Sequence, residues 1–139
     1  MSSLVFFMLY FWMATPINTQ FSVTFTNLPS NQGYVYVLLF NQPDGFPNQP
    51  HKAYRNFKVP IREGAAELSI SGLPVGTYAI STFHDHDNDG VLRTGAFGIP
   101  KDAYGFSNNA KGLFGPPPFE KAAFRLQEVP KKISIRMNL

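Results

Sequence analysis

The stretch YVYVLLF at residues 34–40 decides the fold class of this chain. Its aromatic and β-branched residues are the types that favour extended strands. The second half of the stretch is apolar on both faces, which predicts a central strand. Residues 21–25 (FSVTF) instead alternate apolar side chains with hydroxyls, as a strand with one buried face does.

Five further segments have the composition of short strands: residues 54–59, 66–70, 77–84, 122–126 and 133–139. Turns rich in glycine and proline separate them, and Pro60 confines the end of the first of the five to an edge or a turn. No 11-residue window shows apolar residues at helical spacing. The pattern therefore predicts an all-β fold, an antiparallel β-sandwich of about seven strands, with one long loop rich in glycine and proline at 85–121.

The amino-acid composition excludes several classes of protein and of site. The chain has 139 residues, 44% of them hydrophobic, which suits one domain with a full core. The absence of cysteine excludes a disulfide framework, a zinc–thiolate site and cysteine catalysis. The net charge of +3 is spread thinly and forms no dense basic stripe, so nucleic-acid binding is not expected.

The first twenty residues carry no charged side chain and contain the apolar run LVFFMLYFWMA at 4–14. This run has the length of an export-signal core and is shorter than the roughly 20 residues that span a bilayer. We therefore expect a signal peptide at 1–20, cleaved between 14 and 20, and a domain at 21–139. The mature protein would be periplasmic or extracellular, with no membrane span. A buried first strand is the alternative.

An acidic turn, HDHDNDG at 84–90, holds three of the nine acidic residues of the chain. The carboxylates of Asp85, Asp87 and Asp89 follow the D-x-D-x-D-G spacing of the first half of a calcium loop, and the carbonyl of Val91 stands at position seven. Like charges at this spacing repel one another, and a bound cation would offset that cost. The sequence therefore predicts calcium as a cofactor.

The second half of this loop departs from the EF-hand pattern, because Arg93 and Ala96 replace its acidic ligands and a strand precedes it. We therefore expect a weak site between strands, with a Kd of roughly 10⁻⁴ to 10⁻³ M. A plain polar turn without an ion is one alternative. A transition-metal site formed by His84, His86 and His51 is another.

The long block HDHDNDGVLRTGAFGIPKDAYGFSNNAKGLFGPPPFEKAAF at 84–124 resembles the signature of the DUF2141 family of exported bacterial proteins. The segments LPVGTYAISTFHD and VYVLLFN fit the same pattern, so the resemblance covers about 21–139. It implies a small sandwich of immunoglobulin or transthyretin-like appearance, exported and without an established activity. Members of the family commonly carry an aspartate or a similar residue where this chain has Arg93.

These patterns favour a non-catalytic binding module whose long loop presents a surface to a protein, peptide or carbohydrate. A carboxylate-dependent hydrolase is the alternative, with Asp85, Asp87 and Glu120 as acids and His84 or His86 assisting. The candidate binding residues are His84, His86, Tyr104, Phe106, Asn108, Asn109, Phe114 and Glu120.

Overall fold

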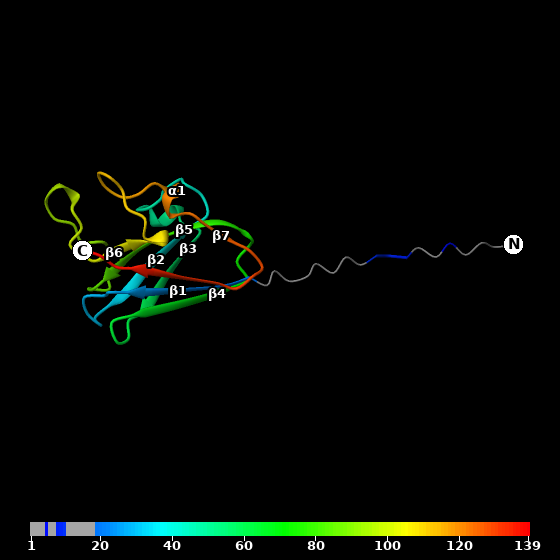
Figure 1. The fold of residues 1–139 in the computed structure, drawn as a ribbon, viewed down its shortest axis with the longest axis horizontal. Coiled ribbons are helices and arrows are strands. Elements are labelled where there is room, and N and C mark those ends of the chain that lie inside the picture. The colour runs from blue at the N-terminus through cyan, green and yellow to red at the C-terminus, as the bar shows by residue number, and fades with distance from the viewer. Residues whose placement is uncertain (1–4, 6–7, 11–18) are drawn as a thin grey trace.

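The computed structural model describes residue 5, residues 8–10 and residues 19–139. The predicted signal peptide and its cleavage site lie almost entirely outside these residues and stay a prediction. The described part of the chain forms eight strands and four short helical turns (Figure 1). The strands are β1 (Gln20–Thr26), β2 (Tyr34–Phe40), β3 (Arg55–Pro60), β4 (Ala66–Ser71), β5 (Gly76–Asp85), β6 (Tyr104–Phe106), β7 (Phe124–Leu126) and β8 (Lys131–Arg136). The turns are η1 (Pro50–Lys52), η2 (Ala96–Gly98), η3 (Ser107–Asn109) and α1 (Phe119–Ala122).

The strands belong to two sheets. One has the order β4-β1-β8, and the other has the order β3-β2-β5-β6 with β7 beside the first half of β5. The predicted β-sandwich is confirmed, and β2 is central, as expected. The strand that ends at Pro60, β3, lies at the edge of its sheet. One pairing differs, because β8 runs parallel to β1, with Val23 opposite Ile133. A parallel pair requires a long connection, and here nearly the whole fold lies between the two strands.

Strand β6 lies inside the predicted long loop and was not predicted. This strand has three residues and pairs with the second half of β5, with Ser81 opposite Phe106. A segment so short, containing Gly105, shows no alternation from which a strand could be predicted. Its pairing follows from the exposed edge that β5 offers at this point.

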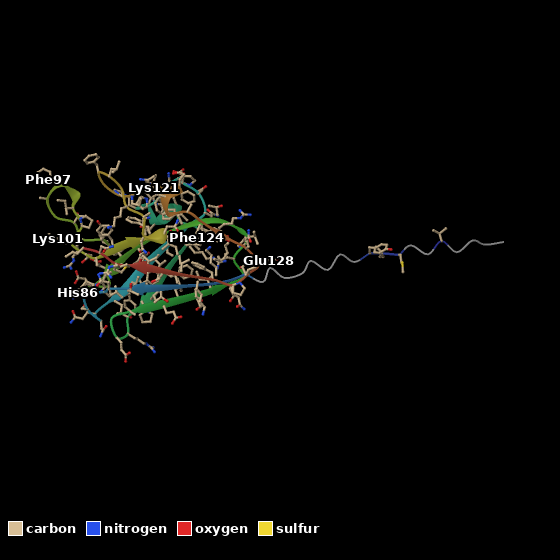
Figure 2. All side chains as sticks on the ribbon, viewed as in Figure 1. His86, Phe97, Lys101, Lys121, Phe124 and Glu128 are labelled. Atoms are coloured by element: carbon tan, nitrogen blue, oxygen red, sulfur yellow. The ribbon has the colours of Figure 1, made fainter. Side chains whose placement is uncertain are left out.

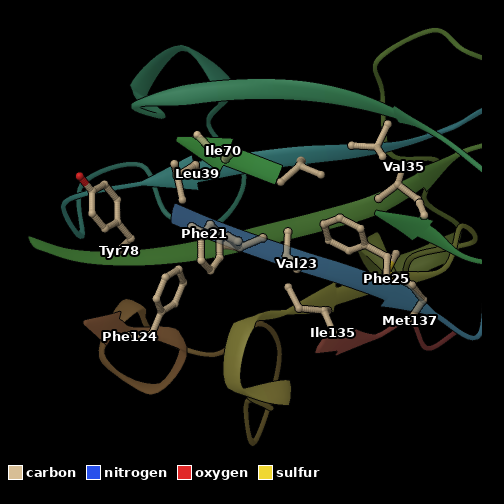
Figure 3. Packing of buried hydrophobic residues seen from close by; sticks show 14 of the residues in the cluster. Phe21, Val23, Phe25, Val35, Leu39, Ile70, Tyr78, Phe124, Ile135 and Met137 are labelled. Atoms are coloured by element: carbon tan, nitrogen blue, oxygen red, sulfur yellow. The ribbon is translucent and has the colours of Figure 1, made fainter. Parts of the chain in front are cut away.

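The main core lies between the two sheets (Figure 3). Alternate residues of β1 and β2 point into it and are at most 1% exposed: Phe21, Val23, Phe25, Val35, Val37 and Leu39. Burial of each such side chain contributes about 1.5–3 kcal/mol. On β5, Tyr78, Ile80, Thr82 and His84 share the inward face.

A second apolar cluster covers the outer face of the larger sheet. Leu38 and Phe40 of β2 point into it, which explains why the second half of that strand is apolar on both faces. Phe119 and Ala122 of α1 pack on them. The described members of both clusters lie between Phe21 and Met137, so we expect the segment 19–139 to fold alone. In this described part, no helix is long and apolar enough to cross a membrane.

Candidate functional site

The acidic turn begins at the end of β5, and its first carboxylate is buried. Asp85 is 1% exposed. Its Oδ1 accepts a hydrogen bond from the Asp89 N–H at 3.2 Å, and its Oδ2 accepts one from the Gly90 N–H at 2.7 Å. Because a buried carboxylate is stable only when it is hydrogen-bonded, these contacts fix the turn. The Asp85 side chain thus orders the start of the long segment.

The turn before β2 packs against this strand end. Gly33 has a φ of 74° and lies so close to Asp85 that a Cβ would collide with the Asp85 carbonyl oxygen. Next to it, the His84 ring donates from Nε2 to the Gln32 carbonyl at 2.6 Å. The acidic turn therefore starts from a tightly packed base.

The other predicted calcium ligands contact different partners. One carboxylate oxygen of Asp87 lies 3.0 Å from His86 Nδ1, and the other lies 3.8 Å from Arg93 Nε. Asp89 Oδ1 accepts the Val91 N–H at 3.0 Å. Among residues 5, 8–10 and 19–139, no three His, Asp or Glu side chains gather as a metal site would require. The predicted ligands share one turn, and a cation would need Asp87 to leave its present partners.

The histidines of the turn also have protein partners. His84 is 3% exposed, and His86 places Nε2 2.5 Å from the Gln32 side-chain oxygen. The two rings meet edge to face, 6.0 Å apart. His51 lies in η1, and the described residues form no metal-binding group that would join it to this pair.

The structure contains an ion pair between Arg93 and Asp102 that was not predicted from the sequence. Arg93 donates to Asp102 from its backbone N–H at 2.9 Å, from Nε at 2.8 Å and from Nη2 at 2.6 Å. Burial would raise the pKa of Asp102, but the hydrogen bonds and positive charge of Arg93 outweigh it, so the pKa lies below its ordinary 3.8. The hydrogen bonds to Asp102, and then its charge, raise the pKa of Arg93. The pair closes the base of a loop.

This loop, residues 93–101, is a compact hairpin and not an irregular excursion. The Lys101 N–H donates to the Arg93 carbonyl at 2.8 Å, and the Gly95 N–H donates to the Ile99 carbonyl at 2.7 Å. Phe97 stands at the apex. Figure 2 shows Phe97 at the far end of this projection and Lys101 nearer to the sheets.

A groove of about 900 Å³ lies between this hairpin, the loop 110–117 and the outer face of the larger sheet. The side chains that line it among the described residues include no Asp, Glu, Lys, Arg or His. They are mostly apolar, with a few hydroxyls and one amide: Leu38, Pro47, Asn48, Ser81, Phe83, Val91, Leu92, Thr94, Ile99, Pro100, Tyr104, Phe106, Phe114 and Pro116 are among them. Its volume suits a small ligand or a short peptide segment.

Four of the predicted site residues line this groove, and others do not. Val91, Tyr104, Phe106 and Phe114 line it. The predicted aromatic surface and Val91, the last ligand of the predicted calcium loop, therefore belong to one groove.

The side-chain amides of η3 do not line the groove, and they form hydrogen bonds with backbone groups. Asn108 Nδ2 donates to the Ala123 carbonyl at 2.8 Å, and Asn109 Oδ1 accepts the Arg136 N–H at 2.9 Å. Both residues have positive φ, 60° and 48°. They stabilise the turn beneath the groove.

Glu120 lies far from the acidic turn. It belongs to α1, which packs on Ala79 of β5, whereas Asp85 ends that strand. Six residues of strand separate these two points by roughly 20 Å. The acids of a glycosidase pair lie within about 10 Å of each other, so the structure does not bring Glu120 and Asp85 together.

Comparison with known proteins identifies the class to which this β-sandwich belongs. The family model DUF2141, described as uncharacterized proteins conserved in bacteria, matches residues 23–134. The chain belongs to the DUF2141 family. Neither the curated proteins nor the solved structures gave a match.

Proposed function

We propose that this protein is an exported, non-catalytic binding module whose groove takes a peptide segment with apolar side chains. The uncharged groove between the two loops carries this proposal. Apolar and proline side chains offer contact area to aliphatic and aromatic residues, and the hydroxyls of Ser81 and Thr94 offer hydrogen bonds to a peptide backbone. A carbohydrate would need more amide and carboxylate partners than this lining supplies.

Fixed walls support a binding role, because a preformed site loses little conformational entropy when a ligand binds. The hydrogen bonds to Asp85 hold the chain that leads into one wall. The Arg93–Asp102 pair closes the base of the same wall. Both sets of contacts lie outside the groove and leave its surface open.

A non-catalytic role is favoured over a carboxylate hydrolase by the chemistry of the lining. Tyr104 is the one titratable side chain among the residues described around the groove. Acid–base catalysis at this surface would lack the paired carboxylates that glycoside hydrolysis uses. The acids of the turn are engaged by backbone N–H groups, His86 and Arg93.

Weak calcium binding at Asp85, Asp87, Asp89 and the Val91 carbonyl is part of the proposal. Its support is the D-x-D-x-D-G spacing and the exposed side chains of Asp87 and Asp89, which can turn toward Asp85. With a Kd near 1 mM, 10 mM calcium would stabilise the fold by about 1.4 kcal/mol. A thermal melt in 10 mM CaCl₂, with 10 mM MgCl₂ as the control, should show a selective rise in Tm. An unchanged Tm in calcium would refute this part.

Export is inferred from the apolar run at 4–14. Expression of the full chain in a bacterium, followed by fractionation and mass determination, should give a periplasmic or secreted protein that begins between residues 15 and 21. Full-length protein in the cytoplasm would contradict export.

The peptide-binding proposal is tested by selection from a random peptide library displayed on phage. Ser81 lies on the groove floor and is half-buried, so Ser81→Phe would fill the space. We expect peptides rich in apolar residues that bind the natural chain and lose binding to Ser81→Phe. A Ser69→Phe variant on the other sheet is the matched control. Selected peptides that bind Ser81→Phe equally well would overturn the proposal.

A further inference from the structure

Two loop apices carry large apolar side chains that none of the described residues covers. Phe97 is 102% exposed and Phe114 is 103% exposed, so each is as accessible as in an extended peptide. Ile99 and Leu113 beside them are 63% and 88% exposed. A single exposed apolar residue needs no explanation, but a group of four on neighbouring projections marks an interaction site.

The backbone is built to present these side chains. Phe97 has a φ of 59°, a left-handed conformation that an aromatic residue rarely adopts. In the second loop, Gly112 lies against the carbonyl oxygens of Gly115 and Pro116, so that only glycine fits there. This close approach makes a tight turn with Leu113 and Phe114 at its apex.

Both apices project from the same side of the molecule. Phe97 and Phe114 border one groove, from opposite walls. Figure 1 shows the two loops, yellow-green and yellow-orange, extending away from the sheet formed by β4, β1 and β8. A flat surface can therefore touch both apices at once.

Two lysines without an ion-pair partner among the described residues lie near the apices in sequence. Lys101 and Lys111 are exposed, and the Lys101 side chain lies against Gly95, two residues from Phe97. Neither lysine forms an ion pair with any residue that the structure describes. The carboxylate between residues 91 and 117 is that of Asp102, which is 5% exposed and paired with Arg93. The apices thus combine apolar tips with a positive rim.

We propose that these two apices attach the protein to the surface of an anionic lipid membrane. The four apolar side chains enter the boundary between head groups and acyl chains, and the two lysines remain at the level of the phosphates. The apolar tips and the positive rim match the acyl chains and the phosphates of such a surface. The inference goes beyond the proposed peptide groove and does not depend on it.

The test is co-sedimentation of the segment 19–139 with lipid vesicles, since the apolar run at 4–14 would itself bind lipid. The vesicles contain phosphatidylglycerol and phosphatidylcholine in equal amounts, or phosphatidylcholine alone. We expect binding to the anionic vesicles that weakens when salt rises from 0.1 to 0.5 M. Phe97→Ser with Phe114→Ser should reduce the partition coefficient at least roughly tenfold. Lys101→Gln with Lys111→Gln should reduce it by a similar factor, as about 1 kcal/mol per lysine implies.

Val129→Ser is the matched control, because Val129 is 66% exposed and lies next to Glu128 at the other end of the molecule (Figure 2). It should leave vesicle binding unchanged. Absence of binding to anionic vesicles, equal binding to both vesicle types, or full binding by the double phenylalanine variant would each overturn the proposal. Self-association in sedimentation velocity that this variant abolishes, without vesicle binding, would show instead that the apices join copies of the chain.

Discussion

At the scale of single residues, two buried carboxylates direct the chain after β5. Asp85 binds the backbone of its own turn, and Asp102 binds Arg93 at the base of the hairpin. Each removes a carboxylate from water and compensates for that cost with hydrogen bonds. The acidic character of this segment therefore has a structural use that is independent of any cation.

Replacing Asp85 by alanine should destabilise the fold. The Asp89 and Gly90 N–H groups would lose their partner, and a buried donor left without one costs about 1–3 kcal/mol. Urea denaturation at pH 7 measures the change in the free energy of unfolding. Asp87→Ala is the control, and because the Asp87 side chain is half-exposed it should change stability by less than about 0.5 kcal/mol. Equal effects of the two substitutions would contradict the assigned role of Asp85.

Asp102→Asn should lower stability in a pH-dependent way. Since the folded-state pKa of Asp102 lies below its ordinary value, the ionised pair stabilises the fold above about pH 4. This contribution is lost as the pH falls through the lowered pKa, because the carboxylate then takes up a proton. Unfolding midpoints of the natural chain and Asp102→Asn should therefore differ at pH 7 and converge toward pH 2. A difference that stays constant over this range would show that the charge is unimportant.

At the scale of elements, the local sequence pattern predicts where the strands lie, but it does not predict which strands pair with each other. Alternation and glycine–proline turns were sufficient to predict seven strands, including the central position of β2. The three-residue β6 and the parallel pairing of β8 depend on edges that only the assembled sheets offer. Asp102 is likewise unremarkable in sequence, because its function depends on how the hairpin returns to Arg93.

Substitution of Gly33 tests how closely the turn before β2 packs against β5. Gly33 and Gly64 have nearly the same backbone φ, 74° and 76°, but a Cβ on Gly33 would meet the Asp85 carbonyl, whereas Gly64 has open space around it. Gly64→Ala should therefore cost only the left-handed backbone penalty of about 1–2 kcal/mol. Gly33→Ala should cost clearly more or prevent folding, as measured by thermal and urea denaturation. Equal costs would show that this contact is absent.

Substitution of Phe119 tests whether α1 packs on the larger sheet. It is 9% exposed, and its ring packs edge to face with Phe46 at 5.8 Å. Phe119→Ala should reduce the free energy of unfolding by about 3–5 kcal/mol. Phe114→Ala, a substitution of the same type at a fully exposed site, should leave it within about 0.5 kcal/mol. A small loss for Phe119→Ala would mean that α1 does not form part of the core.

At the scale of the whole molecule, the candidate site combines segments that are distant in sequence. Residues near 47–50, 81–83, 90–100 and 112–116 line one groove. The aromatic residues of the long loop were predicted to form a surface, and three of them, Tyr104, Phe106 and Phe114, line the groove. The groove itself was not predictable, because its shape depends on two loops that are closed by tertiary contacts.

The most direct test of peptide binding at this groove is a map of amide chemical shifts in ¹⁵N-labelled protein, residues 19–139, titrated with a peptide selected from the library. We predict that the shifts concentrate at Ser81, Val91 and Tyr104 and in the loop 110–117. Amides of β4, such as Leu68 on the other sheet, should stay unchanged. Shifts confined to the sheet of β4, β1 and β8 would contradict the account.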